Sequence, residues 1–430
     1  MEKLGIPSVP MATKSFADLA KSNASKRGMP HLRACFTPHP VWGKTAEQLM
    51  AYVEGNDPVS GKPLMQEIID GLTVPLIAED TKTGMMDVNV GPPVYGPDTL
   101  DNLQIHFLNN GMTDFLPIII PTPEKVDAML KGSSHHPDEV VGKMAAGAFA
   151  AWTFTVRQVA VNAVMAGCEP EYFPILLAVA SSGMAALGSS TSSFAYSMVI
   201  NGPIRDKLNM NYTIGAMGPF AQPNATIGRA WTLIGKNLGN GGIPGDTYMG
   251  SQGNVINYSN LIIPENEKDS PWPPFHVQKG FKPEESVISF FFGFCITQGQ
   301  GGKGLGVKPV PLYNVAMSAN VAPFASLFGA LFLLDPLVAN GLGDLGFKTK
   351  DSVVDWLQKN TTVTVKDVKS MLFSGLPRGP EAANLKDDDV IPKWQKSDAF
   401  NLVVVGGQTN PYHQLANMSY RVSVSIDKWT

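Results

Sequence analysis

Cys168 is the side chain whose position along the chain points most directly to chemistry. It lies between Gly167, which is typical of a helix end, and Pro170, which is typical of a helix start. A thiol at a helix N-terminus lies beside unpaired amides and the positive end of the helix dipole, which favours the thiolate. The carboxylates of Glu169 and Glu171 oppose this effect. Two interpretations remain open: an activated thiol that faces a pocket, or a small buried hydrophobe at a helix corner.

A second group of candidates lies in the proline-rich segment from Glu265 to His276. This segment brings together a carboxylate, an amide, an indole and an imidazole, from Glu265, Asn266, Trp272 and His276. His276 and Glu265 could move a proton as general acid and base, with Asn266 and Trp272 binding the substrate. A hydrogen-bonded network with a purely structural role is an equal alternative.

Arginines in apolar segments could bind an anion. Arg205 follows "INGPI" and Arg229 lies inside "NATIGRAW", with Asn201 and Asn224 nearby in the sequence. The planar guanidinium fits a carboxylate or another oxyanion in a bidentate way, so these four residues are predicted to bind substrate. Each arginine could equally pair with an internal acid, and Arg157, which opens an earlier predicted helix, shares both possibilities.

Two familiar types of ligand site are weakly supported. The stretch from Gly299 to Gly304 matches GxGxxG, but "VKPVPLY" behind it contains two prolines where a nucleotide site needs a helix. The P-loop pattern also fails, because Gly304 follows Lys303. The adjacent His135 and His136 lie in a polar loop and cannot both face one ion from a helix or strand. We therefore predict no cofactor and no metal.

The overall composition limits the class of protein and its setting. The chain has 430 residues, 44% of them hydrophobic, and a net charge of -4, so a surface that binds nucleic acid is not expected. The three cysteines are scattered, which favours a reducing, cytoplasmic setting without disulfides. Cys295 is expected in the core, and the role of Cys35 is open. The N-terminus lacks a signal-peptide pattern, and the uncharged run between Glu171 and Arg205 is interpreted as buried protein, with no membrane contact.

Alternating strand and helix patterns predict an α/β fold with two lobes, mixed sheets flanked by helices and a loop-rich middle section. Residues 1–100 are expected to form strands and loops packed on the core, residues 101–285 a first lobe with the site loops, and residues 286–430 a second lobe. A short strand at "FLPIII" precedes a helix capped by Thr122, with Pro123 at its first position and Gly132 beyond its end. Further helices are expected up to Gly167, from Pro170 and at "KTKDSVVDWLQKN", and a helix capped by Asn224 is expected in "NATIGRAW". Strands are expected at "SMVINGP" and "SVISFFFGFCI", and "FNLVVVGG" is expected as a central strand.

Several phrases resemble a poorly characterised bacterial family. "LPIIIPTPEKVDAML", "VAVNAVMAGCEPEYFPILLA", "INGPIRDKL", "NATIGRAW" and "ENEKDSPWPPFHVQKGF" are similar to proteins that occur with, or fused to, a domain carrying a Cys/Sec-Gly-Ser-Cys tetrapeptide, the UGSC proteins. The similar residues run from about 110 to about 290. The tetrapeptide itself is absent from this chain. The resemblance implies that any thiol/selenol redox chemistry would need a separate partner, and that the loops around Cys168, Arg205, Arg229 and Glu265 form a shared pocket.

Three functions follow from these residues. The leading hypothesis is an enzyme that acts on a small polar or anionic substrate between two lobes, by acid/base or thiol-assisted elimination, addition or hydrolysis. The first alternative is a non-catalytic protein that binds a small ligand or a partner. The second is a metal-dependent hydrolase or hydro-lyase that uses Glu265 and His276. The apolar runs from Tyr172 to Ile204 and from Ala322 to Leu334 also predict a homodimer or larger oligomer.

Overall fold

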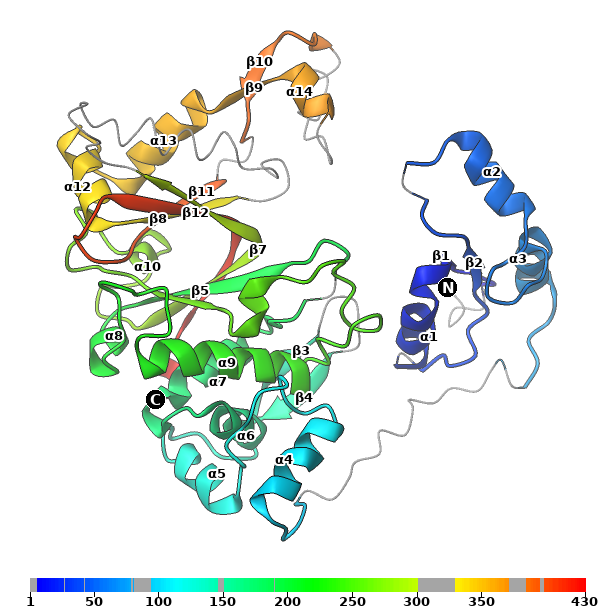
Figure 1. Ribbon diagram of the computed structural model, residues 1–430, viewed down its shortest axis with the longest axis horizontal. Helices are drawn as coiled ribbons and strands as arrows, with labels where there is room; N and C mark the ends of the chain where they lie inside the picture. The colour runs from blue at the N-terminus through cyan, green and yellow to red at the C-terminus, as the bar shows by residue number, and fades with distance from the viewer. Residues whose placement is uncertain are drawn as a thin grey trace.

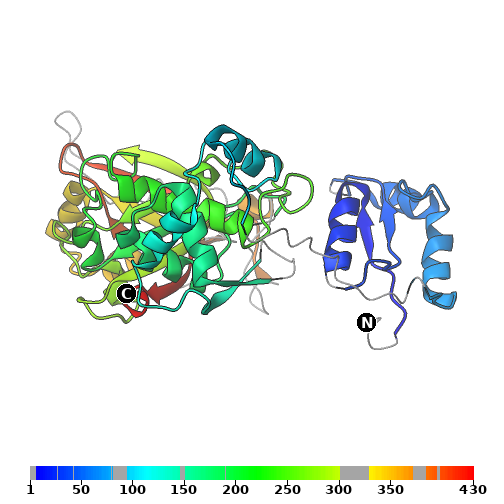
Figure 2. The same cartoon turned by 90° about the horizontal axis from the view of Figure 1, so that it is seen from below.

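The computed structural model describes residues 6–26, 28–41, 43–78, 80, 94–145, 151–188, 190–300, 329–370, 384–394 and 398–430 (Figure 1). The described residues between 6 and 80 form a small unit that Figures 1 and 2 show apart from the rest of the chain. The unit contains α1 (Ala17–Lys26), α2 (Ala46–Glu54), α3 (Leu64–Thr73) and the parallel pair β1 (Met11–Thr13) and β2 (Cys35–Thr37). The prediction of strands and loops was wrong for most of this unit, which is largely helical, and its packing on a core stays a prediction. In α3 the apolar Leu64, Ile68 and Leu72 recur every four residues, a helical period that outweighs the short alternation after them.

The helices next to the predicted site begin and end largely where their caps predict. Thr122 accepts a hydrogen bond from the amide of Lys125 at 3.4 Å and caps α5 (Pro123–Leu130). Helix α6 (Val156–Ala166) ends at Gly167, whose φ of 84° is the left-handed conformation that favours glycine. A short 3₁₀ turn at Pro170–Tyr172 then leads into α7 (Phe173–Ser181). These helices confirm the local signals.

Two local predictions were wrong. Helix α9 (Gln222–Asn237) begins two residues before Asn224, which therefore lies in its first turn and does not cap it. The segment before Thr122 is not a strand. The Gln104 side chain supplies its hydrogen bonds, because it accepts from the amide of Ile118 at 3.3 Å and donates to the Ile118 carbonyl at 2.6 Å. A side chain distant in sequence thus satisfies backbone groups that a neighbouring strand would otherwise satisfy.

One six-stranded mixed sheet organises residues 195–425. Its order is β11-β8-β12-β7-β5-β6, with β5 parallel to β6, β8 parallel to β11, and β12 antiparallel to both β7 and β8. The strands are β5 (Ala195–Asn201), β6 (Leu261–Pro264), β7 (Val287–Gln300), β8 (Ala330–Leu334), β11 (Phe400–Val404) and β12 (Tyr412–Ser425). The mixed α/β class is therefore confirmed, and the sheet takes strands from both predicted lobes. Strand β11 is an edge strand, so the prediction of a central strand there was wrong.

The sheet is curled so that its two edge strands meet. The amide of Asn266, which follows β6, donates to the carbonyl of Val404 in β11 at 2.7 Å. The amide of Val404 approaches the carboxylate of Glu265 at 3.4 Å. Because β6 and β11 stand at opposite ends of the strand order, these contacts bring the two edges together at one point. β11 reads as a central strand in sequence because it is buried despite its edge position.

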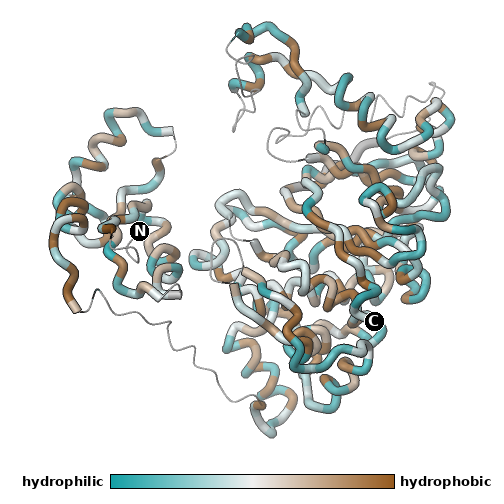
Figure 3. The backbone as a smooth tube through the Cα atoms, turned by 180° about the vertical axis from the view of Figure 1, so that it is seen from behind, coloured by the Kyte–Doolittle hydropathy of each residue, from teal (hydrophilic) through white to brown (hydrophobic). Residues whose placement is uncertain are grey.

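Alternate residues of the strands face two different cores. In β8, Leu331 and Leu333 lie in the cluster inside the curl, whereas Phe332 and Leu334 pack outward against α12 (Pro336–Asp344) and α13 (Lys350–Asn360). Helices α6, α7 and α9 cover the outer face of β5 and β7. Figure 3 shows the resulting apolar stretches along the strands. Burial on both faces explains why β8, for example, is a continuous apolar run rather than an alternating one.

Shorter elements complete the described chain. They are α4 (Leu100–Asn109), α8 (Ile204–Lys207), α10 (Phe275–Gln278), α14 (Val365–Ser370), and the antiparallel pairs β3 (Val140–Met144) with β4 (Trp152–Thr155) and β9 (Thr362–Thr364) with β10 (Val390–Pro392). Among the described residues, no helix has both the length and the apolar character needed to cross a bilayer. Helix α7 and strand β5, from the run between Tyr172 and Ile204, are buried in the chain's own core. That run therefore does not supply an apolar surface for association, and an oligomer stays a prediction.

Candidate functional site

The sequence-predicted residues Glu265, Asn201 and Arg205 come together in a buried polar network where the sheet edges meet. One Glu265 oxygen accepts from Lys350 Nζ at 2.7 Å, and the other accepts from Asn201 Nδ2 and the Phe275 amide, both at 2.6 Å. The side chains of Glu265 and Lys350 are 0% and 1% exposed. Lys350, at the start of α13, was not predicted. The Glu265 carboxylate thus accepts hydrogen bonds from four different elements, α13, β5, α10 and β11, so both of its oxygens have donors.

Arg205 belongs to the same network and already has an acidic partner. Its guanidinium forms an ion pair with Glu267 at 2.9 Å and donates to the carbonyl oxygens of Gly202 and Glu265. Glu267 also accepts from Asn201 Nδ2 at 2.9 Å. The described network therefore balances two acids against two bases. This pairing corresponds to the structural alternative that the sequence left open for Arg205.

His276 and Trp272 lie in the same segment but do not join Glu265 in a proton relay. His276 is fully buried, and its Nε2 hydrogen-bonds to the Lys282 carbonyl at 3.1 Å, while its Nδ1 has no partner among the described residues. Trp272 is buried and donates to the carbonyl of Phe347 at 2.9 Å. The predicted general acid/base pair of His276 and Glu265 was wrong, because Phe275 contributes its amide to Glu265 and His276 turns to a different acceptor.

Arg229 and Asn224 lie on α9, and their side chains form hydrogen bonds with residues outside the Glu265 network. Arg229 forms a bidentate pair with Asp114, at 2.8 and 2.9 Å, and donates to the Pro117 carbonyl at 2.7 Å. The side-chain amide of Asn224 forms hydrogen bonds with the backbone of the preceding loop, at Asn211 and Ala216. The pairing of Arg229 with Asp114 corresponds to the internal ion pair that the sequence left open as the alternative, and a role of Arg229 in substrate binding stays a prediction. Arg157 likewise pairs with Asp127, at 3.3 Å.

Cys168 is a buried thiol at the corner that the sequence predicted. Its side chain follows the Gly167 turn, and its amide donates to the Ala163 carbonyl at 3.1 Å. Burial raises the pKa of the thiol to about 12, and the Glu169 carboxylate adds to this, although Thr226 and Arg229 lower it. The dipole-activated thiolate was therefore a wrong prediction. Loss of hydration raises the thiol pKa more than the following helix can lower it, because that helix starts with only a short 3₁₀ turn. Cys35 is also buried, and the side chain of Cys295 lies outside the described residues.

We expect Cys168 to resist alkylation in the native protein. At pH 8, iodoacetamide should label it at least about 100-fold more slowly than in the unfolded chain, because a thiol with a pKa near 12 is almost entirely protonated. Peptide mass spectrometry after timed quenching measures the rate residue by residue. Labelling of native Cys168 as fast as that of the denatured chain would contradict its burial.

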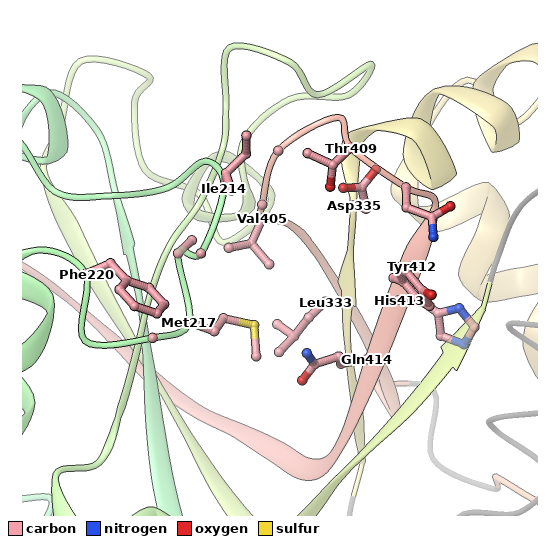
Figure 4. Close-up of a pocket in the computed structure, with 16 residues that line it drawn as sticks. Ile214, Met217, Phe220, Leu333, Asp335, Val405, Thr409, Tyr412, His413 and Gln414 are labelled. Carbon is pink, nitrogen blue, oxygen red and sulfur yellow. The ribbon is translucent and has the colours of Figure 1, made fainter.

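A pocket of about 370 Å³ opens at the end of the core inside the curl (Figure 4). It forms where β8 and β11 end, and the start of β12 and the loop before α9 supply its other walls. Sixteen residues line it: Ile214, Gly215, Ala216, Met217, Gly218, Phe220, Leu333, Asp335, Val405, Gly406, Gly407, Thr409, Asn410, Tyr412, His413 and Gln414. None of the nine sequence-predicted site residues is among them.

Backbone hydrogen bonds hold in place the segments that carry Asp335 and Gly406. The amide of Asp335 donates to the Tyr412 carbonyl at 3.0 Å, and the amide of Gly406 donates to the Tyr212 carbonyl at 3.0 Å. Asn266, a sequence-predicted site residue that does not line the pocket, supports the Gly406 segment, because its Nδ2 donates to the Gly406 carbonyl at 3.0 Å. Gly406 has a φ of 102°, which requires glycine, and lies against the Asp335 carboxylate. The loop after β11 and the loop before α9 are in contact where Gly407 packs on Ile214, and a Cβ atom would not fit there.

Burial shifts the pKa values of two pocket-lining residues, Asp335 and His413, in opposite directions. Asp335 caps α12, because its Oδ1 accepts from the Leu337 amide at 2.7 Å. Burial raises the pKa of Asp335 to about 6, although this hydrogen bond lowers it. Burial also lowers the pKa of His413 to about 4. Near neutral pH the histidine is therefore uncharged, and the aspartate is the group that can take up or release a proton.

Residues 1–59 match the model of the UGSC family. The chain resembles the UGSC family. The matched segment lies in the N-terminal unit, whereas the phrases that suggested the same family in sequence lie between residues 110 and 290. No curated protein matches the chain, and no solved structure matches it either. The pocket lies outside the segment matched to UGSC, so its chemistry must be argued from its own residues.

Sequence reasoning missed Asp335, His413 and the polar residues after β11. The signal that could have found them was two apolar strands that each end in polar residues, "LFLLDP" and "LVVVGGQTNPYH". Had the two strands been taken as parallel neighbours, their carboxyl ends would have been placed together. The predicted glycine loop from 301 onward lies outside the described residues. Among the described residues no cluster of three His, Cys, Asp or Glu side chains could hold a metal ion.

Proposed function

We propose that this protein is an enzyme that transfers protons on a small polar molecule bound in the pocket at the ends of β8 and β11. Asp335 acts as the general base or acid, in an addition or elimination reaction. One observation carries the proposal. Asp335 is a carboxyl group on the wall of a ligand-sized pocket, and burial brings its pKa to about 6, near the pH at which a proton acceptor must work.

The surroundings of Asp335 suit this role. Thr409 lies beside it in Figure 4, and hydroxyl and amide groups of Tyr412, Asn410 and Gln414 offer hydrogen bonds that would orient a bound molecule. One carboxylate oxygen is held by the α12 cap, which fixes the side chain and leaves the other oxygen for the substrate. A thiol-assisted route is not part of this proposal, because Cys168 is buried, protonated and not among the lining residues.

Solvent exchange tests the proposal through the proton transfer alone, whatever the complete reaction is. We expect the protein in D₂O to catalyse exchange of acidic C–H protons in at least one member of a panel of small hydroxy and carbonyl compounds, followed by proton NMR. Asp335→Asn should slow this exchange by about 100-fold or more, because the amide cannot accept the proton. The wild-type rate should fall as pH drops below about 6, where Asp335 becomes protonated.

The asparagine variant also separates catalysis from folding. Asparagine caps a helix about as well as aspartate, so α12 should keep its cap. Because the folded pKa of Asp335 is raised, the native state is favoured while the group is protonated and loses that advantage as pH rises through about 6. Asp335→Asn should therefore be at least as stable as wild type at pH 8. Undiminished exchange in this folded variant would overturn the proposal, and binding without exchange would favour the non-catalytic alternative.

A further inference from the structure

The two sides of the pocket differ in polarity. In Figure 4, Phe220 and Met217 lie on one side, whereas Asp335 and Thr409 lie on the other. Leu333 and Val405 belong to the core inside the curl and give the pocket an apolar floor. A ligand that matches this surface must therefore carry a polar group at one end and an apolar group at the other.

Two large apolar side chains of the pocket are exposed to solvent. Phe220 is 75% exposed and Ile214 is 67% exposed, and both lie on the same loop at the pocket. The loop is held from behind, since Asn224 bonds Ala216 at 3.1 Å. Apolar side chains that gather at a pocket, rather than being scattered singly, are typical of a binding surface. A phenyl or short alkyl group of a bound molecule would remove this surface from water.

The charge of the pocket limits the polar end of the ligand. Among the described residues that line the pocket, Asp335 is the one that carries a formal charge near neutral pH, since His413 is neutral there and these residues include no lysine or arginine. An anionic head would meet a carboxylate without a compensating cation. Of the polar or anionic substrate expected from the sequence, the polar alternative fits this pocket, because Arg205 and Arg229 pair with internal acids elsewhere.

We infer that the substrate class is an uncharged amphipathic molecule, with a hydroxyl, carbonyl or amide head toward Asp335 and Thr409 and an aryl or short alkyl tail against Met217 and Phe220. This inference rests on the proposed function for the choice of an uncharged head, because Asp335 must exchange a proton with it rather than hold a fixed cation. The tail assignment rests on the exposed wall alone.

Three small probes that differ in one feature at a time test the inference: phenylacetamide, phenylacetate with a charged head, and acetamide without the phenyl tail. Their dissociation constants are measured at pH 7.5 by NMR titration of the full-length protein. Phenylacetamide should bind at least 10-fold more tightly than phenylacetate, which adds a repelled charge, and than acetamide, which lacks the tail. If acetamide binds as tightly as phenylacetamide, the inference of an apolar tail is wrong. If phenylacetate binds as tightly or more tightly, the inference of an uncharged head is wrong.

Variants locate the binding and separate the two proposals. Phe220→Ala should weaken phenylacetamide about 10-fold, whereas Phe115→Ala, which removes an equally exposed phenyl (76%) outside the pocket lining, should leave it unchanged. Asp335→Asn should bring phenylacetate close to phenylacetamide in affinity. If the probes behave as expected but no C–H exchange depends on Asp335, the proposed enzyme fails and the ligand class stands. If Asp335-dependent exchange occurs only on probes without a tail, the ligand class fails and the enzyme stands.

Discussion

Replacing Lys350 with methionine is expected to lower the free energy of unfolding by about 3 to 5 kcal/mol. The substitution keeps much of the side-chain volume but removes the only cation bonded to the Glu265 carboxylate among the described residues. Glu265 is 0% exposed, so its charge would be left without a partner in a medium that solvates it poorly. Chemical denaturation followed by tryptophan fluorescence measures the loss.

A surface ion pair of the same length provides the matched control. Lys369 and Asp387 also lie 2.7 Å apart, but their side chains are 48% and 61% exposed. Lys369→Met should change stability by no more than about 1 kcal/mol, because water replaces the lost partner. Similar losses at both positions would show that burial does not set the strength of the Glu265–Lys350 pair.

A second substitution tests the cause of the destabilisation. In the Lys350→Met background, Glu265→Gln removes the stranded charge and should recover part of the lost stability. Its side-chain oxygen can still accept from Asn201 Nδ2 or from the Phe275 amide. If the double variant is less stable than Lys350→Met alone, the loss comes from packing at the junction of the sheet edges and not from an unpaired charge.

Acid should destabilise the fold through His413, by roughly 3 kcal/mol between pH 7 and pH 4. Burial lowers the pKa of His413 from 6.5 to about 4 in the folded chain, whereas the unfolded chain keeps the ordinary value. The unfolded state therefore binds a proton first as pH falls. The stabilising contribution is fully present above about 6.5 and is lost as pH falls toward 4.

The measurement compares unfolding free energies of wild type and His413→Gln at pH 7 and pH 4. Glutamine cannot be protonated, so the loss of stability on acidification should be smaller in this variant by about 3 kcal/mol. His136→Gln is the control, because the His136 side chain is 76% exposed. Equal acid sensitivity of wild type and His413→Gln would show that His413 does not titrate as a buried group.

The predictions for the Glu265–Lys350 pair and for His413 concern residues of different standing in the sequence analysis. Glu265 was selected as a catalytic acid because it lies in a segment crowded with polar groups, and that crowding is real. Its neighbours, however, are Lys350 from α13, Asn201 from β5 and the Phe275 amide, which together make a closed network. His413 was not selected, because one histidine inside a strand carries no local signal. Residue type alone did not separate a satisfied carboxylate from a reactive one.

The sequence by itself determined part of the local structure, chiefly the capped helices. Thr122 and Gly167 act on backbone groups within about four residues, and the apolar positions of α6 and α13 recur at a helical period, so both signals can be recognised without the fold. The mixed α/β class followed from the same alternation of patterns. Tertiary structure decided the strand order and the meeting of β6 with β11, and so it decided which loops share a pocket. It also decided the protonation of Cys168, Asp335 and His413, because a pKa depends on the water that packing removes, and packing partners come from distant parts of the chain.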